Sequence, residues 1–405
     1  MAQINFTLDY DFLIGLFSKN PQEAFGKLIE QILNQILDAE STEKLKAKPS
    51  ERNEDRTDYR NGTRERSLNL RVGKITLKVP RHRYEPFHSC IFEQYQRNES
   101  ALISTMMEMV IQGVSTRKIE KVTQELCGQS FSKSTVSKLC KQLDAEVDAF
   151  KKRRLDGIYP FVMLDAIYIK VREDNKVSSK ALYVALGINE DGYKEIIGFD
   201  LYDTETKAGW KDFLIGLKDR GLTKTDLFIS DNHEGLTKAI QAVYPDVAWQ
   251  RCQVHFKRNI MDKVPKKYQT AVKEALTEMF NCKDIESARK KRNEIISKYE
   301  DVCESAMEVL DTGFEDTMAV MNLPKRYRIP LRTTNLLERE NEEIRRRERV
   351  IRIFPNRDSA LRLMGALLMD HNDTWKGRSR SLAMRLYFEE REEYLKEMPI
   401  LKPSA

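Results

Sequence analysis

The chain has 405 residues, enough for two or three domains of ordinary size and too many for one small binding module. Hydrophobic residues make up 40% and charged residues 33%, and we expect neither a membrane-spanning segment nor an export signal, hence a cytoplasmic protein. Lysine and arginine number 69 against 63 acidic residues, a surplus that permits a polyanionic partner without requiring one. Six scattered cysteines without a Cys-x-x-Cys pair predict reduced thiols.

The first predicted helix begins near Asn20, which is followed by Pro21 and Glu23 in the pattern of a helix cap. Apolar residues from Phe25 to Leu37 recur at three-four spacing and form one stripe, which needs a partner surface. The partner is either the preceding segment 12–14 or the same helix of a second subunit. We favour the second alternative and interpret residues 1–40 as the dimerisation region of a homodimer.

Residues 41–66 are nearly all polar and charged, which predicts a linker. In residues 67–98, apolar and polar residues alternate on both sides of Gly73, which indicates a β-hairpin. Its polar side chains form a basic patch with no acidic residue between Ser67 and Tyr84, which favours DNA binding, although a solvated strand face is the alternative. The residues of this patch are Arg71, Lys74, Lys78, Arg81 and Arg83.

Residues 99–150 have the pattern of three helices, with glycines at positions 113 and 128 in the turns between them. The last two predict a helix-turn-helix that binds DNA, and a plain helical bundle is the alternative reading. The predicted DNA-contacting residues of this domain are Arg117, Ser134, Thr135, Lys138 and Lys141.

A different pattern begins near residue 151. Three apolar, β-branched runs (159–171, 181–188 and 195–201) are followed by alternating helical and strand patterns, which is the element order of an RNase H-like domain. We therefore predict an α/β plus α protein: the first part of the catalytic domain at 151–256, an all-helical insertion at 257–331, the final catalytic segment at 332–375 and a helical tail at 376–405.

Three acidic residues are candidates for catalysis. Asp165 interrupts an apolar strand, Asp231 ends the short strand 227–230, and Glu338 lies in a predicted helix. Three converging carboxylates suit hard divalent cations and phosphodiester chemistry. Each also has an ordinary alternative, because an Asp after a strand often caps a helix and a helix rich in Arg and Glu is often a solvated surface.

Several motifs, in this order along the chain, resemble the Mutator-related transposases of bacterial insertion sequences. The resemblance spans about residues 60 to 375, so it is far more specific than any one motif. The segments that carry it are Arg81-His82-Arg83, 113–117, Leu164-Asp165-Ala166, Ser230-Asp231, 251–255, 332–339, 344–347 and 353–356.

This family consists of DDE transposases, and the resemblance implies that Asp165, Asp231 and Glu338 bind two Mg²⁺ ions, with Mn²⁺ as a substitute. It implies binding of the terminal inverted repeats of an insertion sequence, double-stranded DNA as substrate and target, and strand cleavage followed by strand transfer. Arg345, two helical turns after Glu338, resembles a basic residue that contacts a DNA phosphate, although an ion pair with Glu342 is an alternative.

The pair Cys252 and His255 resembles a Cys/His motif of the same class. Two ligands do not complete a tetrahedral zinc site, so we favour a role in shaping the active site. Asn335 and Arg339 belong to the motif around Glu338 without an assigned role. Two other functions share these features: a DNA-binding repressor or domesticated relic without catalysis, and an RNase H-like nuclease without strand transfer.

Overall fold

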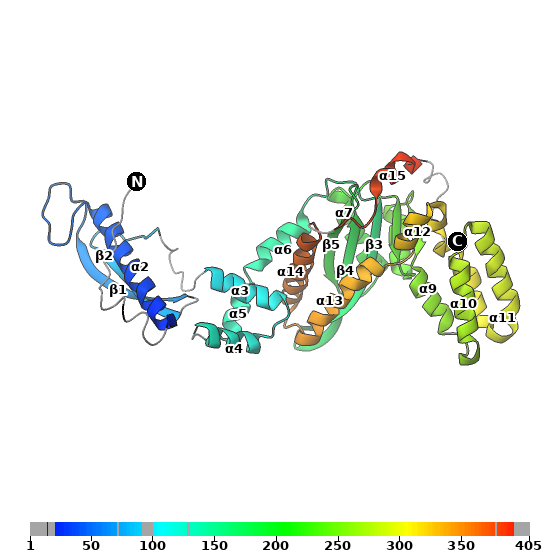
Figure 1. The fold of residues 1–405 in the computed structure, drawn as a ribbon, viewed down its shortest axis with the longest axis horizontal. Coiled ribbons are helices and arrows are strands. Elements are labelled where there is room, and N and C mark those ends of the chain that lie inside the picture. The colour runs from blue at the N-terminus through cyan, green and yellow to red at the C-terminus, as the bar shows by residue number, and fades with distance from the viewer. Residues whose placement is uncertain are drawn as a thin grey trace. The chain divides into compact units, whose positions relative to one another are not determined.

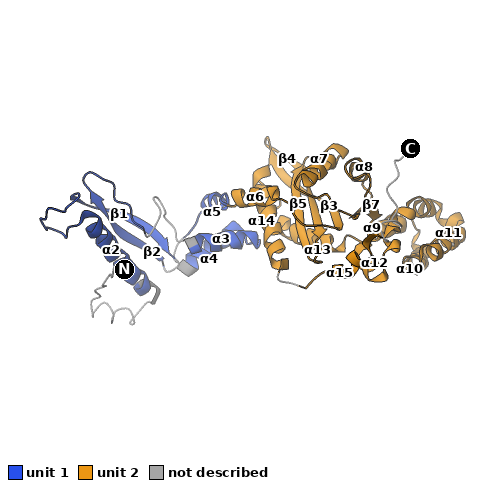
Figure 2. Cartoon of the chain, turned by 90° about the horizontal axis from the view of Figure 1, so that it is seen from above, with its two compact units in different colours: residues 1–142 blue, residues 143–405 orange. Residues whose placement is uncertain are grey.

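The structure, a computed structural model, describes residue 14 and residues 21–70, 73–90, 100–127, 130–376 and 379–392. None of the helices formed by these residues has the combination of length and apolar composition that a bilayer crossing requires. The chain divides into two compact units, residues 1–142 and 143–405, coloured separately in Figure 2. Each unit has its own hydrophobic clusters and is described by itself.

In the first unit, helix α2 (Pro21–Leu45) packs against the hairpin of β1 (Arg60–Leu70) and β2 (Gly73–His82) (Figure 1). Leu37 is fully buried in the hairpin core, with Ile29 and Leu33 packed beside it. Side chains of α2 also accept hydrogen bonds from backbone amides of strand β2: Glu30 accepts from Thr76, and Asn34 accepts from Lys78. The apolar stripe from which we expected a dimer contact is thus covered, at these three positions, by the chain's own hairpin.

The hairpin is longer than predicted. Strand β1 begins at Arg60, and α2 extends to Leu45, so both enter the segment 41–66 that we expected to be a linker. The first half of β1 is solvent-exposed and therefore lacks the apolar alternation that marks a strand. The pairing also places Glu65 directly opposite Lys78. The basic patch therefore has an acidic neighbour, which lies just before the segment from Ser67 to Tyr84 that contains no acidic residue.

The rest of the first unit contains α3 (Ser100–Ile111), α4 (Thr116–Cys127) and α5 (Lys133–Cys140), which share one apolar cluster. The predicted third helix is interrupted. Helix α5 ends when the amide of Lys141 bonds to the carbonyl of Lys138, and α6 (Leu143–Lys152) starts afterwards, within the second unit. The predicted domain 99–150 therefore crosses the boundary between the units.

The second unit is built on a mixed sheet. Its strands, in the order β5-β4-β3-β6-β7, are β3 (Phe161–Glu173), β4 (Lys176–Ile188), β5 (Lys194–Tyr202), β6 (Leu227–Ser230) and β7 (Ala248–Arg251). Strands β3, β4 and β5 are antiparallel neighbours, whereas β6 and β7 run parallel to β3. The first four residues of β3 are fully buried because this strand lies at the centre of the sheet.

Helices cover both faces of this sheet, as Figure 1 shows. Helices α7 (Lys207–Asp219) and α8 (Glu234–Val243) pack together over one face, where Trp210 and Ile240 are buried. Helices α6 and α14 (Arg357–Lys376) contact each other and β5, and α13 (Asn335–Ile351) contacts β3. A layered α/β arrangement of this kind was predicted from the order of the patterns.

The packing of α14 depends on Gly365. A Cβ atom there would lie 2.6 Å from Val147 Cγ1 of α6 and 2.9 Å from Phe199 Cζ of β5. We expect Gly365→Ala to destabilise the protein by about 1–3 kcal/mol through overpacking, as measured by urea unfolding. In the matched control Gly216→Ala in α7, a Cβ meets no atom within 4 Å. That variant should be neutral or slightly more stable, and equal effects of the two would contradict the packing argument.

Between β7 and α13 the chain is helical. The elements are α9 (Gln253–Met261), α10 (Gln269–Phe280), α11 (Ile285–Gly313) and α12 (Lys325–Leu331), with short 3₁₀ turns at Lys266–Tyr268, Glu315–Thr317 and Ala319–Asn322. This region has its own apolar cluster around Phe256, Leu276 and Leu310. The predicted all-helical segment 257–331 is therefore present, but it starts at Gln253 because α9 follows the end of β7 at once.

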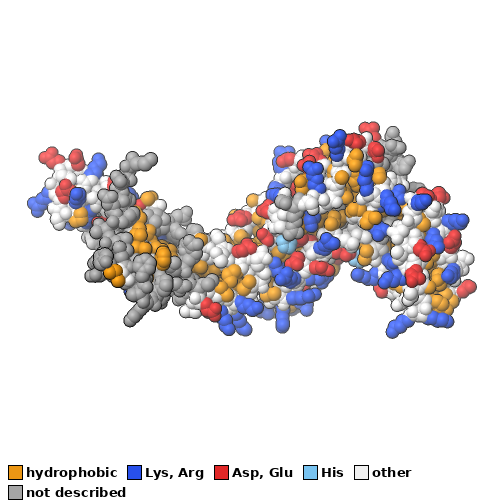
Figure 3. Space-filling model, viewed as in Figure 1, with side chains coloured by type: hydrophobic (Ala, Val, Ile, Leu, Met, Phe, Trp, Pro, Cys, Tyr) orange, Lys and Arg blue, Asp and Glu red, His pale blue; other side chains and the backbone are white. Residues whose placement is uncertain are grey.

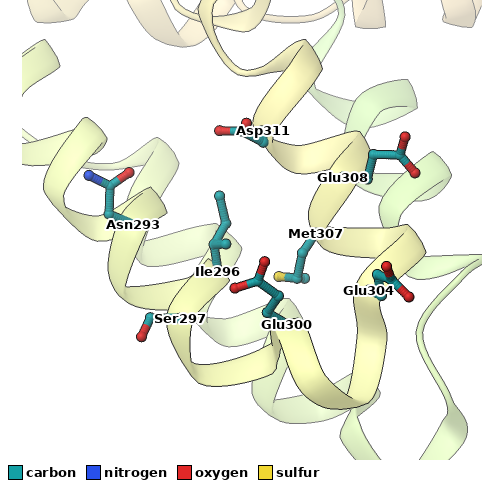
Figure 4. A pocket seen from close by; sticks show the side chains of 8 residues that line it. All are labelled: Asn293, Ile296, Ser297, Glu300, Glu304, Met307, Glu308 and Asp311. Atoms are coloured by element: carbon teal, nitrogen blue, oxygen red, sulfur yellow. The ribbon is translucent and has the colours of Figure 1, made fainter.

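Helix α11 is kinked at Cys303, where φ is −141° and ψ is 42°. A pocket lies between its two arms (Figure 4), and its acidic lining residues are Glu300, Glu304, Glu308 and Asp311. No cationic side chain lines the pocket among the described residues, so it is ill-suited to a nucleic acid.

After α14 the described chain forms the short helix α15 (Met384–Glu389), which packs on the sheet domain of the second unit. Tyr387 and Arg391 both donate to the carboxylate of Asp226, which lies just before β6. At Gly192, where φ is +90°, a Cβ would overlap the backbone carbonyl of Leu382. The segment expected as a helical tail therefore packs on the sheet domain through residue 391.

Candidate active site

The parallel pairing of β3 and β6 brings two of the predicted acids together. The register pairs Val162 with Phe228 and Met163 with Ile229. Asp165 lies two residues after Met163, and Asp231 lies two residues after Ile229. The two acids therefore occupy adjacent positions at the same edge and on the same side of the sheet. Strand β6 ends at Ser230, which leaves Asp231 at the start of the loop to α8.

Asp165 is an acid in unfavourable surroundings. Burial, followed by the negative charge of Asp231, raises the pKa of its carboxyl group to about 7. Two hydrogen bonds oppose this shift: the amide of Ala166 donates to Oδ1 at 2.8 Å, and the Asn341 side chain donates to Oδ2 at 2.6 Å. Two carboxylates this close favour a bound cation, because the cation removes the repulsion between them.

Helix α13 supplies Glu338 and Asn341 one turn apart, so both lie on the same face of the helix. Asn341 is 8% exposed, and while its amide nitrogen holds Asp165, its buried Oδ1 atom makes no hydrogen bond to any residue in the described part of the chain. Glu338 is half-buried, and its Oε1 atom lies 3.4 Å from the hydroxyl of Thr334. Asn341 thereby attaches the Glu338 helix to the Asp165 strand.

The end of the next strand adds Cys252 and His255. Ser230 pairs with Arg251 across β6 and β7, and the amide of Cys252 donates to the carbonyl of Ser230 at 2.7 Å. Cys252 is the first residue after β7, just as Asp231 is the first residue after the neighbouring strand β6. His255 lies in the first turn of α9. Its Nε2 atom is 3.8 Å from Glu338 Oε1.

Cys252 and His255 influence each other's protonation. Burial raises the pKa of the Cys252 thiol, but its interactions with His255 and Thr334 outweigh burial, and the net shift is downward. The interaction with Cys252 raises the pKa of His255 to about 9, against the effect of burial, and the charges of Asp165 and Glu338 act in the same direction. Both shifts favour a thiolate beside an imidazolium.

The structure therefore gathers Asp165, Asp231 and Glu338, with Cys252 and His255, around one edge of the sheet. Within the described residues, one group of three potential metal ligands has its donor atoms within 4.8 Å of one another, and that group is Cys252, His255 and Glu338. The three carboxylates are less tightly clustered. Their oxygen donors still match the preference of Mg²⁺, and the carboxyl pair and the unpaired Asn341 Oδ1 are what a hydrated cation would satisfy.

Sequence reasoning missed three residues of the site. Asn341 was not singled out in its charged helix, and Thr334 belonged to the motif 332–339 without an assigned role. Glu205 is a further acid, whose pKa is raised by burial and by the charge of Asp231, although His233 opposes the shift. The His233 Nδ1 atom lies 3.6 Å from Glu205 Oε2. No spacing rule links these residues, because they come from α13 and its N-cap, the loop before α7 and the start of α8.

The predicted DNA-contacting residues are mostly accessible. In the hairpin, Lys74, Lys78, Arg81 and Arg83 are exposed, and Arg71 lies outside the described residues. Arg117, Lys138 and Lys141 are exposed on their helices, as is Ser134. The hydroxyls of Ser134 and Thr135 contact the hydroxyl of Ser132, which caps α5. These two residues thus already have a local role at the helix start.

Arg345 is exposed on α13, and among the described residues it forms no ion pair with Glu342; its neighbours Arg346 and Arg347 pair with Glu343 instead. Figure 3 shows Lys and Arg side chains along the lower edge of the second unit, below α13. The motif residues Asn335 and Arg339 are also exposed on this helix. The helix that supplies Glu338 therefore also presents free cationic side chains.

A partly buried ion pair connects α13 to α14. His371 Nδ1 lies 2.6 Å from Glu340 Oε1. This hydrogen bond raises the pKa of His371 against the effect of burial, with smaller contributions from Asp370 and Glu343. A raised histidine pKa stabilises the fold fully below the unfolded value of about 6.5, and the stabilisation is lost as the pH rises through the folded pKa.

We expect the wild-type protein to have a higher unfolding free energy than His371→Gln, and we expect this difference to be larger at pH 6 than at pH 9. Urea unfolding in buffers of equal ionic strength measures both values. A stability difference independent of pH would show that the ion pair contributes nothing.

A mixed sheet with helices on both faces and carboxylates gathered at one edge defines an α/β protein with a candidate metal site. The chain belongs to the Mutator family of transposases, because the model of that family matches residues 14–378.

Several similar proteins are named as transposases for insertion sequence elements. The chain is 45% identical over 388 residues to the transposase for insertion sequence element IS256 in transposon Tn4001 of Staphylococcus aureus, an alignment that covers 94% of this chain and 98% of the relative. It is 40% identical to the transposase for insertion sequence element ISRM5 of Rhizobium meliloti, covering 90% and 92%. The resemblance inferred from the motifs is confirmed.

Proposed function

We propose that this protein is a DDE transposase that binds the terminal inverted repeats of an insertion sequence and catalyses metal-dependent DNA cleavage and strand transfer. This proposal is supported mainly by the geometry of the site. Asp231 directly follows strand β6, next to the part of β3 that bears Asp165, and its charge acts on the Asp165 carboxyl group. Asn341 connects Asp165 to the helix that bears Glu338. The strand order, with three antiparallel strands followed by two parallel ones, supports an RNase H-like catalytic domain.

In this proposal Asp165, Asp231 and Glu338 hold two Mg²⁺ ions, for which Mn²⁺ would substitute. When bound, the ions supply an activated oxygen nucleophile and neutralise charge on the leaving oxygen. The chain's residues fix the geometry. Asn341 orients the Asp165 carboxylate, and Arg345 contacts a DNA phosphate next to the reacting one.

The reaction has two phosphoryl transfers and no covalent protein intermediate. In the first, water attacks the phosphodiester at the end of the element, the bond to the 3′ oxygen breaks, and a free 3′ hydroxyl is released. In the second, that hydroxyl attacks a target phosphodiester and displaces another 3′ oxygen, so one bond forms for each that breaks. The exposed basic residues of the hairpin and of α4 and α5 would bind the DNA ends, and a homodimer would pair two ends.

A joining experiment tests this function. Labelled DNA carrying the sequences that flank the gene is incubated with full-length protein, target plasmid and Mg²⁺. We expect cleavage at the element end and covalent joining of its 3′ end to the target. Specific binding without cleavage under any divalent metal would instead identify a repressor or relic, and cleavage without joining would identify a nuclease.

A further inference from the structure

The tightest cluster of potential metal ligands in the described residues is not the carboxylate triad. It consists of the Cys252 thiol, the His255 imidazole and the Glu338 carboxylate, whose donor atoms all lie within 4.8 Å of one another. The pair Cys252 and His255 alone could not complete a zinc site, which was the argument against zinc from the sequence. Helix α13 supplies the third ligand from a distant part of the chain.

The geometry is close to what a tetrahedral ion requires. With bonds of 2.0–2.2 Å, a histidine nitrogen and a carboxylate oxygen on one Zn²⁺ are separated by about 3.4 Å. His255 Nε2 and Glu338 Oε1 are 3.8 Å apart. A small movement of the Glu338 side chain, which is 33% exposed, would close the difference. Three protein ligands plus one water is the usual set of an open zinc site.

The polar contacts at the cluster bring its ligand atoms together. The Cys252 thiol interacts with the His255 ring, and the Nε2 atom of that ring lies 3.8 Å from Glu338 Oε1. The hydroxyl of Thr334 lies 3.4 Å from both Cys252 Sγ and Glu338 Oε1. The Thr334 hydroxyl is therefore a neutral donor that contacts two of the three ligands.

We propose that Cys252, His255 and Glu338 form a binding site for a thiophilic divalent cation of the Zn²⁺ class, which overlaps the oxygen-only site of the Mg²⁺ ions at Glu338. A sulfur and a nitrogen ligand select such an ion, whereas Mg²⁺ prefers carboxylates and water. Binding displaces the thiol proton, and the thiolate sulfur becomes a ligand.

The two sites share Glu338. An ion held by Cys252 and His255 takes up this carboxylate, so Zn²⁺ and the proposed Mg²⁺ ions compete for it. The site itself does not depend on the proposed reaction; only the inhibition of that reaction by Zn²⁺ rests on it. The cluster thereby provides a point where a metal other than the catalytic one can stop the enzyme.

The test uses Co²⁺, a spectroscopic substitute for Zn²⁺, added to the purified full-length protein with a phosphine reductant. We expect a near-ultraviolet thiolate-to-cobalt charge-transfer band whose intensity corresponds to one thiolate-bound Co²⁺ per chain. Cys252→Ser should lose the band. The matched control Cys303→Ser removes another buried free thiol, in the kink of α11, and should retain it. Absence of the band in wild type, or its persistence in Cys252→Ser, overturns the proposal.

A second variant covers the case in which Cys252→Ser fails to fold. His255→Asn removes a half-buried ligand and should weaken Co²⁺ binding at least about tenfold while the thiolate band persists at saturation. Unchanged affinity would also overturn the site. Asp165→Asn should leave the band intact, because Asp165 is not a ligand of this cluster. Loss of cleavage by Asp165→Asn and loss of the band by Cys252→Ser thus report separately on the proposed function and on this site.

Discussion

Replacing Asp165 by Asn should abolish cleavage and joining of DNA while leaving DNA binding intact. The substitution keeps the size of the side chain and removes one anionic ligand from the proposed metal site. Because metal stabilisation of the transition state amounts to several kcal/mol, we expect a loss of about a thousandfold or more in the single-turnover cleavage rate. The basic residues proposed to bind DNA lie on other elements, so affinity measured by gel shift should change little.

A matched control separates this effect from a general loss of negative charge. Asp191 is an exposed aspartate in the turn between β4 and β5, away from the carboxylate cluster. Asp191→Asn should cleave like wild type. Full cleavage by Asp165→Asn, or equal losses in the two variants, would contradict the assignment of the triad.

Replacing Asn341 by Ala should lower the cleavage rate about 10–100-fold, the range measured when the partner that orients a metal ligand is removed. The amide of Asn341 is the side-chain donor to Asp165, and it fixes the distance between the strand of Asp165 and the helix of Glu338. We expect the loss to be largest at low Mg²⁺ and partly recovered at high Mg²⁺, because a poorly oriented carboxylate binds the ion more weakly.

The control for this prediction is Asn293→Ala, an exposed asparagine on α11 in the helical segment. It should leave both the rate and its Mg²⁺ dependence unchanged. If Asn341→Ala cleaved at the wild-type rate at every Mg²⁺ concentration, the hydrogen bond to Asp165 would have no part in positioning the site.

Much of the second unit could be predicted from local patterns. Three apolar runs, the first of which contains Asp165, predicted β3, β4 and β5 within a few residues. The run of the central strand is apolar on both faces, as expected of a strand covered on both sides. Asp165 and Asp231 were candidates because a carboxylate within or at the end of such a strand is conspicuous, but local sequence alone left each an ordinary alternative, and for Asp231 this was a helix cap. Glu338 was not conspicuous, since its helix is rich in acids, and only the resemblance to a family selected it.

The rest depended on contacts between distant parts of the chain. The hydrogen bond from the Asn341 side chain to Asp165 joins residues far apart in sequence, and no sequence pattern in α13 distinguishes Asn341 from its neighbours. Glu338 likewise lies close to Cys252 and His255, from which it is far apart in sequence. The start of β1 was missed because its exposed residues are polar throughout. In each case a tertiary contact, rather than local periodicity, decided the outcome.

The most direct test of the central proposal is to count Mn²⁺ ions bound to the full-length protein on DNA carrying the element end, by electron paramagnetic resonance of the free ion. We predict two ions per chain in wild type and in Cys252→Ser, and fewer in Asp165→Asn, Asp231→Asn and Glu338→Gln. Each of the three variants should lose binding, because the carboxylates act as one site. Full Mn²⁺ occupancy in any of these three would contradict the proposed triad.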